Sequence, residues 1–451
     1  MKKKILAALM VAAVMLVTTA CGNVSEGIEN GGSEGVTITD ENPADETAKD
    51  NESDEPADAS VDISGDDTNE TDADEEEAPV KTWYETMLDI SVKSKGNNYR
   101  VKKVLEKARS GETVNVAMLG GSITEGAGAT TNDEGYAYQF ADKFKETYCA
   151  GDNLNFVNAG LSGTPSSLGV MRYQRDVVDA LGTAPDLLVI EFAVNDWQEA
   201  TGGRALESLI YRALTDNEEC AVILLYSSSK GKWNVQSDMN PYATYYGVPS
   251  VSVLDAIKST TEISDNDFFY DEYHPKTYGH TIMCDCLMNL FDVLDKAEEN
   301  VPFEIPETPK KGREFANMTL VQSDSTGISI DKGAFSDTDN SVQSCYFTKS
   351  SCFPKNFMKG SEAGGPLKIT VKCRTMLLDY KTANDGSFGT AEVYVDGALV
   401  TTLEGNSSGG WNNNNVVLII DEAEAENHTV EIKMADGSEN KKFTVLSLAY
   451  N

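Results

Sequence analysis

Between residues 81 and 300, short apolar β-like runs alternate with helix-length segments, and this alternation constrains the fold more than any other feature of the chain. A strand followed by a helix before the next strand implies a parallel sheet, whose right-handed crossovers place helices on both faces. The predicted strands are residues 113–119, 154–159, 186–194, 221–227 and 250–254. The predicted helices include residues 136–148, 167–181, 206–215 and 275–298. We therefore expect a three-layer α/β fold around a five-stranded parallel sheet.

The pattern changes after residue 300. Residues 301–313 contain three prolines and a basic run, which is typical of a linker. From residue 314 onward the apolar positions fall in short alternating segments, and Asp396-Gly397 between two of them predicts a tight β-hairpin. Residues 314–451 are accordingly expected to form an all-β sandwich or jelly roll, a fold found in sugar-binding modules.

Acidic residues dominate the charged composition, with 73 Asp+Glu against 37 Lys+Arg and a net charge of −36. This balance argues against nucleic-acid binding, which rests on basic side chains that neutralise phosphates. Residues 22–80 alone carry 21 Asp+Glu and a single lysine, Lys49. Such a segment cannot bury enough apolar area to offset its ordering entropy, so we predict a disordered acidic linker. The alternative is an acidic tail that binds a partner.

Residues 1–21 begin with three lysines, continue with an apolar run and end in Thr-Thr-Ala-Cys. The apolar run is shorter than the roughly 20 helical residues that span a bilayer, so it predicts a signal peptide. The ending resembles the lipobox of bacterial lipoproteins, which implies lipidation of Cys21 and a lipid anchor on the extracellular face of the cell membrane. The alternative is an ordinary secretory signal in which Cys21 lies near the cleavage site by chance.

Three loops that follow predicted strands carry residues suited to chemistry, and sites in parallel sheets form at the carboxyl ends of strands. In the first loop, glycines before Ser122 let the chain turn sharply and leave the serine hydroxyl at the sheet edge. No Lys-Ser/Thr follows Gly126, which excludes a phosphate-binding Walker loop. The second loop contains Gly163 and the third contains Asn195. Taken singly, each loop also fits a purely structural turn.

A fourth segment, Asp271 to Pro275, precedes the last predicted helix of the α/β region and contains one of only three histidines. His274 lies just before Pro275, a residue suited to the first position of a helix. Asp271, three residues earlier, is close enough in sequence to reach the imidazole. A histidine with a local carboxylate is a better candidate for a general base than His280 inside the helix or His428 in the β region.

The cysteine pattern fits neither a disulfide scaffold nor a metal site. Eight cysteines occur, and lipidation of Cys21 would leave seven, an odd number. No two Cys-x-x-Cys motifs stand at zinc spacing, so no metal is expected. Cys345 and Cys352 fit either a disulfide or two buried free thiols.

Together, the four segments resemble the sequence blocks of the SGNH, or GDSL-like, hydrolase family. The matches run in the family's order across residues 112–298, and they are Gly121-Ser122, Ser162-Gly163, Asn195-Asp196 and Asp271 to Pro275. Ala193 stands where the third block often has glycine, which leaves the Asn195 amide in place. The resemblance implies a flavodoxin-like form of the α/β sandwich for residues 81–300.

The resemblance also implies a serine esterase. Ser122 is the implied nucleophile, His274 the base that takes its proton, and Asp271 the group that orients the imidazole. The implied oxyanion hole consists of the N–H groups of Ser122 and Gly163 and the side-chain amide of Asn195. The reaction that the resemblance implies is ester hydrolysis through an acyl-enzyme, with no metal or cofactor.

The expected substrate follows from the combination of features. A surface anchor, an SGNH core and a β domain resemble bacterial carbohydrate esterases, which remove acetyl or other short acyl groups from polysaccharides, so the expected partner is an acetylated glycan or a small ester. Trp197 is predicted either to restrict acyl length or to be a core residue. Trp411 is predicted to stack on a sugar ring, to overhang the active site, or to fill the core of its own domain. Two other functions stay open, an O-acetyltransferase with the same triad and a non-enzymatic glycan-binding lipoprotein.

Overall fold

A six-stranded sheet forms the centre of the α/β region, with strand order β1-β6-β5-β4-β2-β3. The five predicted strands are β2 (Val114–Gly120), β3 (Leu154–Gly160), β4 (Leu187–Glu191), β5 (Ala221–Tyr226) and β6 (Ser250–Ser252). They pair in parallel, which confirms the predicted fold class. The sixth strand, β1 (Val92–Ser94), was not predicted and pairs antiparallel with β6 at the edge. A three-residue strand is too short to show an alternating pattern.

The computed structural model describes residues 81–451. The predicted signal peptide, the lipidation of Cys21 and the acidic linker of residues 22–80 fall outside the described residues. Within residues 81–451, no helix combines the length and apolar character needed to cross a membrane.

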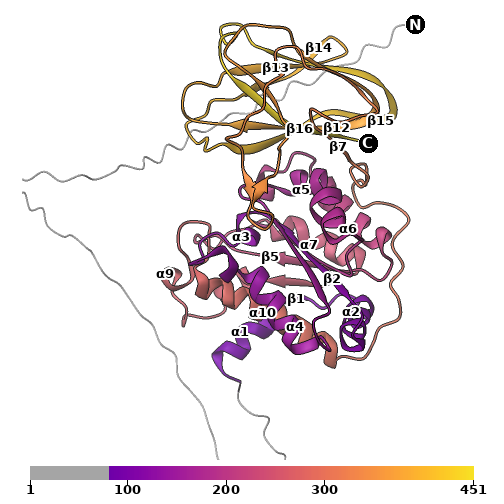
Figure 1. The fold of residues 1–451 in the computed structure, drawn as a ribbon. Helices are drawn as coiled ribbons and strands as arrows, with labels where there is room; N and C mark the ends of the chain where they lie inside the picture. The colour runs from indigo at the N-terminus through magenta and orange to yellow at the C-terminus, as the bar shows by residue number, and fades with distance from the viewer. Residues whose placement is uncertain (1–80) are drawn as a thin grey trace, which may run out of the picture. The chain divides into compact units, whose positions relative to one another are not determined.

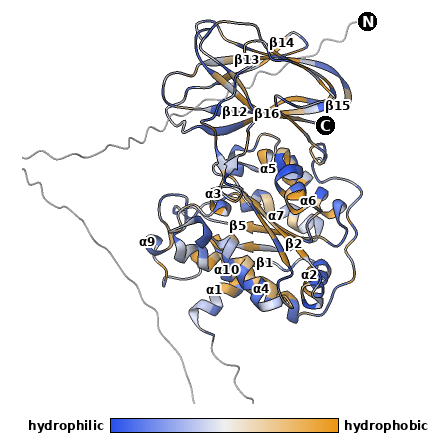
Figure 2. Ribbon diagram, in the orientation of Figure 1, coloured by the Kyte–Doolittle hydropathy of each residue, from blue (hydrophilic) through white to orange (hydrophobic). Residues whose placement is uncertain are grey.

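Helices cover both faces of the α/β sheet (Figure 1). Because successive strand residues point to opposite faces, Ala117 and Leu119 of β2 join one apolar cluster, and Val116 and Met118 join the other. The first cluster is closed by α5 (Ser166–Tyr173), α6 (Arg204–Asp216) and α7 (Gln236–Tyr246). The second is closed by α1 (Trp83–Ser91), α2 (Tyr99–Ser110), α4 (Tyr136–Tyr148), α8 (Val253–Lys258), α9 (Asp265–Phe268) and α10 (Thr277–Lys296). Hydropathy colouring shows the central strands as strongly hydrophobic (Figure 2).

Two predicted helices differ from expectation in ways that matter for the site. The segment predicted at 167–181 is α-helical only as far as Tyr173 and continues as a π-helix, η2 (Gln174–Asp179). The last helix begins at Thr277, so Pro275 is not its first residue. Instead, Pro275 pairs with Phe269 in an isolated antiparallel bridge. His274 therefore lies on the return arm of a tight loop, where its carbonyl accepts from Tyr270 N at 2.8 Å.

The C-terminal region is all-β, as predicted. Its main sheet has the order β11-β16-β12-β15-β13-β14, with β7 added to β16 and β8 to β12. The strands are β7 (Thr319–Val321), β8 (Ser329–Asp331), β11 (Phe357–Lys359), β12 (Leu367–Thr382), β13 (Thr390–Val395), β14 (Ala398–Glu404), β15 (Asn413–Met434) and β16 (Phe443–Tyr450). The sheet encloses an apolar core of its own. Asp396 and Gly397 form the predicted hairpin turn, both with positive φ, as a type I′ turn requires.

A small separate hairpin, β9 (Ser344–Cys345) with β10 (Ser350–Ser351), projects from the β region toward the α/β region (Figure 1). One apolar cluster continues across the contact between the two regions, because Phe315, Phe353 and Leu446 pack in the same cluster as α5 and α6. Arg204 of α6 also pairs with Asp421 of β15 through two contacts of 2.9 Å. All described residues belong to a single compact unit, Glu77–Asn451.

Candidate active site

The loops after β2, β3 and β4 meet at one end of the sheet. Ser122 is the first residue of a short helix, α3 (Ser122–Glu125), and Gly121 is its N-cap. Asn195 follows β4 and precedes the 3₁₀ helix η3 (Asp196–Gln198). A side chain on Gly121 would place Cβ only 2.3 Å from Asn195 Oδ1. The loop of Ser122 and the loop of Asn195 can approach this closely because Gly121 has no side chain.

Ser122, His274 and Asp271 form a continuous hydrogen-bonded chain. His274 Nε2 lies 2.9 Å from Ser122 Oγ, and Nδ1 lies 2.8 Å from Asp271 Oδ2. An ionised carboxylate only accepts hydrogen bonds, so the imidazole proton is on Nδ1 and Nε2 is the acceptor that faces the serine hydroxyl. This is the tautomer that a general base needs.

The turn that contains Asp271 prepares its carboxylate for this role. Asp271 Oδ1 accepts the backbone N–H groups of Tyr273 and His274, each at 2.8 Å. Partial burial opposes the charge, but the hydrogen bonds from the imidazole and from these two backbone groups outweigh it and hold the pKa of Asp271 below its usual value. The carboxylate is therefore ionised and fixed in position before any substrate arrives.

The three predicted oxyanion donors surround the same space. The Ser122 N–H belongs to the first turn of α3 and has no partner within the helix. Gly163, with φ +70°, lies in the turn that follows β3. Within residues 81–451, neither the Gly163 N–H nor Asn195 Nδ2 donates a hydrogen bond to another protein group. Because Oδ1 of Asn195 faces Gly121, its Nδ2 is the free end of the amide.

A buried carboxylate that the sequence analysis did not identify lies beneath the serine loop. Glu191, the last residue of β4, accepts from Thr124 Oγ1 at 2.9 Å and from Ser227 Oγ, and its carbonyl accepts from Gly121 N at 3.3 Å. Complete burial raises the pKa of Glu191. These contacts hold the serine loop against β4 and β5. The sequence did offer a signal for this residue, because Glu191 is a charged residue inside a strand that is otherwise predicted to be apolar.

A buried arginine ties two strand ends together, and it was also not predicted. Arg172 of α5, 1% exposed, donates to Ala159 O at 2.7 Å and to Gly120 O at 3.0 Å. Asp176 contacts Arg172 at 3.3 Å and Arg175 at 2.6 Å. Burial opposes the Asp176 charge, but the two guanidinium groups outweigh it and lower the pKa of Asp176. Periodicity assigns Arg172 to a helix but does not show which face it occupies.

A cavity of about 470 Å³ opens beside the serine and is rimmed by aromatic residues. Trp197 is 61% exposed, Trp411 is 51% exposed, and Tyr273 is also exposed. The prediction that Trp197 or Trp411 fills a core is therefore wrong for both residues. Trp411 comes from the β region, and a Cβ on Gly163 would lie 2.9 Å from its indole ring.

The seven cysteines among residues 81–451 are free thiols. The side chains of Cys345 and Cys352 nevertheless lie close together. A hydrogen bond from the Cys352 thiol lowers the pKa of Cys345 to about 5. No group of three or more His, Cys, Asp or Glu side chains within the same residues is arranged to hold a metal ion.

Comparison with known proteins agrees with this architecture. Residues 118–282 match the family model described as GDSL-like Lipase/Acylhydrolase family. Two crystal structures of a two-domain esterase (CEX) active on acetylated mannans, one of them co-crystallised with mannopentaose, superpose with TM-scores of 0.70 and 0.69 at 24% identity. The alignments cover 80% of this chain and 98% and 97% of those chains, so the shared fold includes both regions. No curated protein sequence matches the chain.

Residues 118–282 of the α/β region therefore carry a GDSL-like lipase/acylhydrolase domain. The protein is a carboxylic ester hydrolase.

Proposed function

We propose that the protein removes short acyl groups, chiefly O-acetyl groups, from carbohydrate by covalent catalysis at Ser122. The observation that carries this proposal is the hydrogen-bonded chain from Ser122 Oγ through His274 to Asp271, with distances of 2.9 and 2.8 Å. Serine attack on an ester needs a base at this distance and an oriented imidazole.

The arrangement accounts for each step of hydrolysis. Ser122 Oγ attacks the ester carbonyl carbon while its proton passes to His274 Nε2, and Asp271 stabilises the resulting imidazolium. The carbonyl oxygen becomes negative and is met by the N–H groups of Ser122 and Gly163 and the amide of Asn195. The sugar hydroxyl leaves with the proton from His274. Water then attacks the acyl-enzyme by the same route and releases the acid.

Three observations support a glycan ester as substrate. The cavity is open, so a polymer side group can enter it. The exposed rings of Trp197, Trp411 and Tyr273 offer flat apolar faces with polar edges, which suit contact with sugar rings. The structurally similar esterase is described as active on acetylated mannans.

The test is acetate release from a panel of acetylated plant and cell-wall glycans, including acetylated mannan, and from p-nitrophenyl acetate. We expect wild-type protein to release acetate and Ser122→Ala to release none above background. Asn195→Ala should lower turnover on the order of 10²- to 10³-fold, the usual cost of losing one oxyanion donor. Equal rates for wild type and Ser122→Ala would contradict the proposal.

The O-acetyltransferase alternative uses the same triad. It differs in the acceptor of the acyl-enzyme, so the ratio of free acetate to acetate transferred onto a glycan acceptor separates the two reactions. Non-enzymatic glycan binding is disfavoured by the assembled Ser122–His274–Asp271 chain.

We also propose that the enzyme acts outside the cell while anchored through Cys21. The support is the signal-like sequence of residues 1–21. Metabolic labelling with a fatty-acid analogue should mark the wild-type chain, and Cys21→Ser should lose the label.

A further inference from the structure

We propose that Gln343, from the C-terminal β region, is a positioning residue that holds the Ser162–Gly163 peptide in the orientation the oxyanion hole requires. The proposal rests on the function proposed above and adds a residue to its machinery. Gln343 is 181 positions from Ser162 in the sequence, yet its side-chain Nε2 donates to the Ser162 carbonyl oxygen at 3.1 Å.

The contact acts on the oxyanion donor because of peptide geometry. The Ser162 carbonyl and the Gly163 N–H belong to one planar trans peptide, so they point in opposite directions. A donor that fixes the carbonyl on one side therefore fixes the N–H on the other side. The same hydrogen bond polarises the peptide and makes the N–H a stronger donor.

This peptide needs such support because it belongs to a turn that has a second conformation. Ser162 and Gly163 are the central turn residues, and Gly163 has φ +70°, as the glycine of a type II turn does. Rotation of the central peptide converts type II to type I, and glycine accepts the φ values of both forms. The rotated peptide would present the Ser162 carbonyl, in place of the Gly163 N–H, to the developing negative charge. It would also lose the Gln343 hydrogen bond.

The orientation of the Gln343 amide agrees with this role. The Ser162 carbonyl only accepts hydrogen bonds, so the glutamine must turn its NH₂ group toward it. Its other amide atom, Oε1, is buried and has no hydrogen-bond partner among residues 81–451. A buried acceptor without a partner is unfavourable and requires a reason. The reason here is the contact that Nε2 makes with Ser162.

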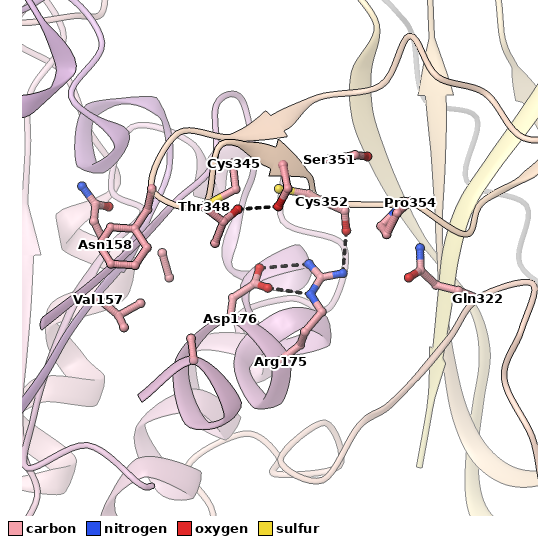
Figure 3. Close-up of a pocket in the computed structure, with 14 residues that line it drawn as sticks. Val157, Asn158, Arg175, Asp176, Gln322, Cys345, Thr348, Ser351, Cys352 and Pro354 are labelled. Carbon is pink, nitrogen blue, oxygen red and sulfur yellow. Dashed lines mark hydrogen bonds and ion pairs between the residues drawn. The ribbon is translucent and has the colours of Figure 1, made fainter. Parts of the chain in front are cut away.

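The hairpin that carries Gln343 is anchored on the α/β region. Gln343 O accepts from Cys352 N at 3.1 Å across the β9–β10 hairpin. The Arg175 guanidinium donates to Cys352 O at 2.6 Å and is held by Asp176, as Figure 3 shows. The ring of Phe353 is fully buried, and the Arg175 guanidinium lies 5.5 Å from its centre. Gln343 is therefore part of a fixed structure and not of a free surface loop.

The test uses the full-length chain with two substitutions that remove the donor. Gln343→Met keeps the approximate volume, and Gln343→Glu keeps the shape but presents a carboxylate that cannot donate. We expect kcat for p-nitrophenyl acetate to fall by about ten-fold for Gln343→Met and by more for Gln343→Glu, with KM within about two-fold, because the oxyanion forms only in the transition state.

The matched control is Gln322→Met. Gln322 belongs to the same β region and donates to a backbone carbonyl, Leu446 O, at 3.5 Å, away from the oxyanion loop. It should leave kcat unchanged. An equal fall in kcat for Gln322→Met, or a kcat within two-fold of wild type for both Gln343 variants, would overturn the proposal.

A second measurement does not depend on activity. The sequence contains only four Ser–Gly pairs, so labelling with carbonyl-¹³C serine and ¹⁵N glycine isolates four amide signals by NMR. The Gly163 signal should shift in Gln343→Met and stay in place in Gln322→Met. An unmoved Gly163 signal overturns the proposal even if kcat falls. If the wild-type protein shows no Ser122-dependent turnover, the proposed function fails, and this measurement still decides the Gln343 contact.

Discussion

The two regions of the chain each hold a histidine against an aspartate at the same distance. His274 Nδ1 lies 2.8 Å from Asp271, and His428 Nδ1 lies 2.8 Å from Asp396. The second ring nitrogens differ. Nε2 of His274 faces Ser122 Oγ beside an open cavity, whereas Nε2 of His428 is buried and has no hydrogen-bond partner among residues 81–451.

This difference shows what a histidine–aspartate pair needs in order to catalyse. At His428 the aspartate belongs to a hairpin turn and the pair fastens that turn to β15. At His274 the loop after β2 brings Ser122 to the imidazole. A histidine–aspartate pair is by itself a structural unit. The histidine can act as a base only where a loop at the end of the sheet brings a serine to its second ring nitrogen.

The largest expected effect comes from replacing each of the two histidines in turn. His274→Asn should lower kcat for p-nitrophenyl acetate by about 10⁶-fold, the order of loss found when a serine hydrolase loses its base. His428→Asn should leave kcat within about two-fold. Both variants are measured by nitrophenol release. A comparable loss in the two variants would mean that activity depends on the overall fold and not on the His274 site.

The second effect concerns the aspartate that orients the imidazole. Asp271→Asn should lower kcat by about 10⁴-fold, because an amide in this position favours the wrong tautomer of His274. The loss should exceed that of Asn195→Ala, which removes one of three oxyanion donors. If Asp271→Asn keeps more activity than Asn195→Ala, the assigned role of Asp271 is wrong.

The third histidine extends the comparison to stability. His280 is fully buried, accepts from Tyr136 N at 3.2 Å and donates to Ala127 O at 3.0 Å. Burial lowers its pKa from 6.5 to about 4. Between these pH values the unfolded chain binds a proton that the folded chain does not. The free energy of unfolding should therefore fall as the pH drops from 6.5 to 4.

The size of this contribution is about 3 kcal/mol. His280→Gln can keep one acceptor and one donor but does not titrate, so its unfolding free energy should change less over the same pH range. Urea denaturation at several pH values measures the difference. Parallel pH profiles for the two proteins would contradict the assignment.

The smallest effect concerns the Asp396 turn. Asp396→Asn retains a residue that tolerates positive φ but weakens the hydrogen bonds to His428 and Thr429. We expect a loss of about 1 kcal/mol in the free energy of unfolding, with kcat unchanged. The hydrogen bonds from Thr429 and His428 lower the pKa of Asp396, so the stabilisation is present at neutral pH and is lost as pH falls below about 4. A fall in kcat without a fall in stability would show that the turn reaches the active site.

Sequence reasoning located the residues whose roles depend on local pattern. The apolar runs from residue 113 to 254 predicted the five parallel strands, and the Asp396-Gly397 pair predicted its turn. The structure also brings Ser122 and His274 together, although 152 positions separate them, because the loop after β2 meets the loop between α9 and α10. Whether these residues catalyse remains a prediction.

Residues that act through long-range contacts were not found, for physical reasons. The side chains of Arg172 and Glu191 look ordinary in sequence, and only burial gives them their roles. Gln343 lies in a segment without any strong pattern, and its partner is a backbone carbonyl, which every residue has. Strand β1 and the start of α10 were missed because short edge strands and helix ends depend on neighbours more than on propensity.

Strand β16, the last strand along the described chain, lies between β11 and β12 in the interior of the β sheet. Strands β11 and β12 both pair with β16, so the sheet cannot form completely before β16 has been synthesised. We therefore expect a nascent chain that already contains Ser122, His274 and Asp271 to lack a settled oxyanion loop until Phe443–Tyr450 has emerged and the β region has folded. Built in this order, the enzyme would reach full hydrolytic power only after Tyr450 has been synthesised.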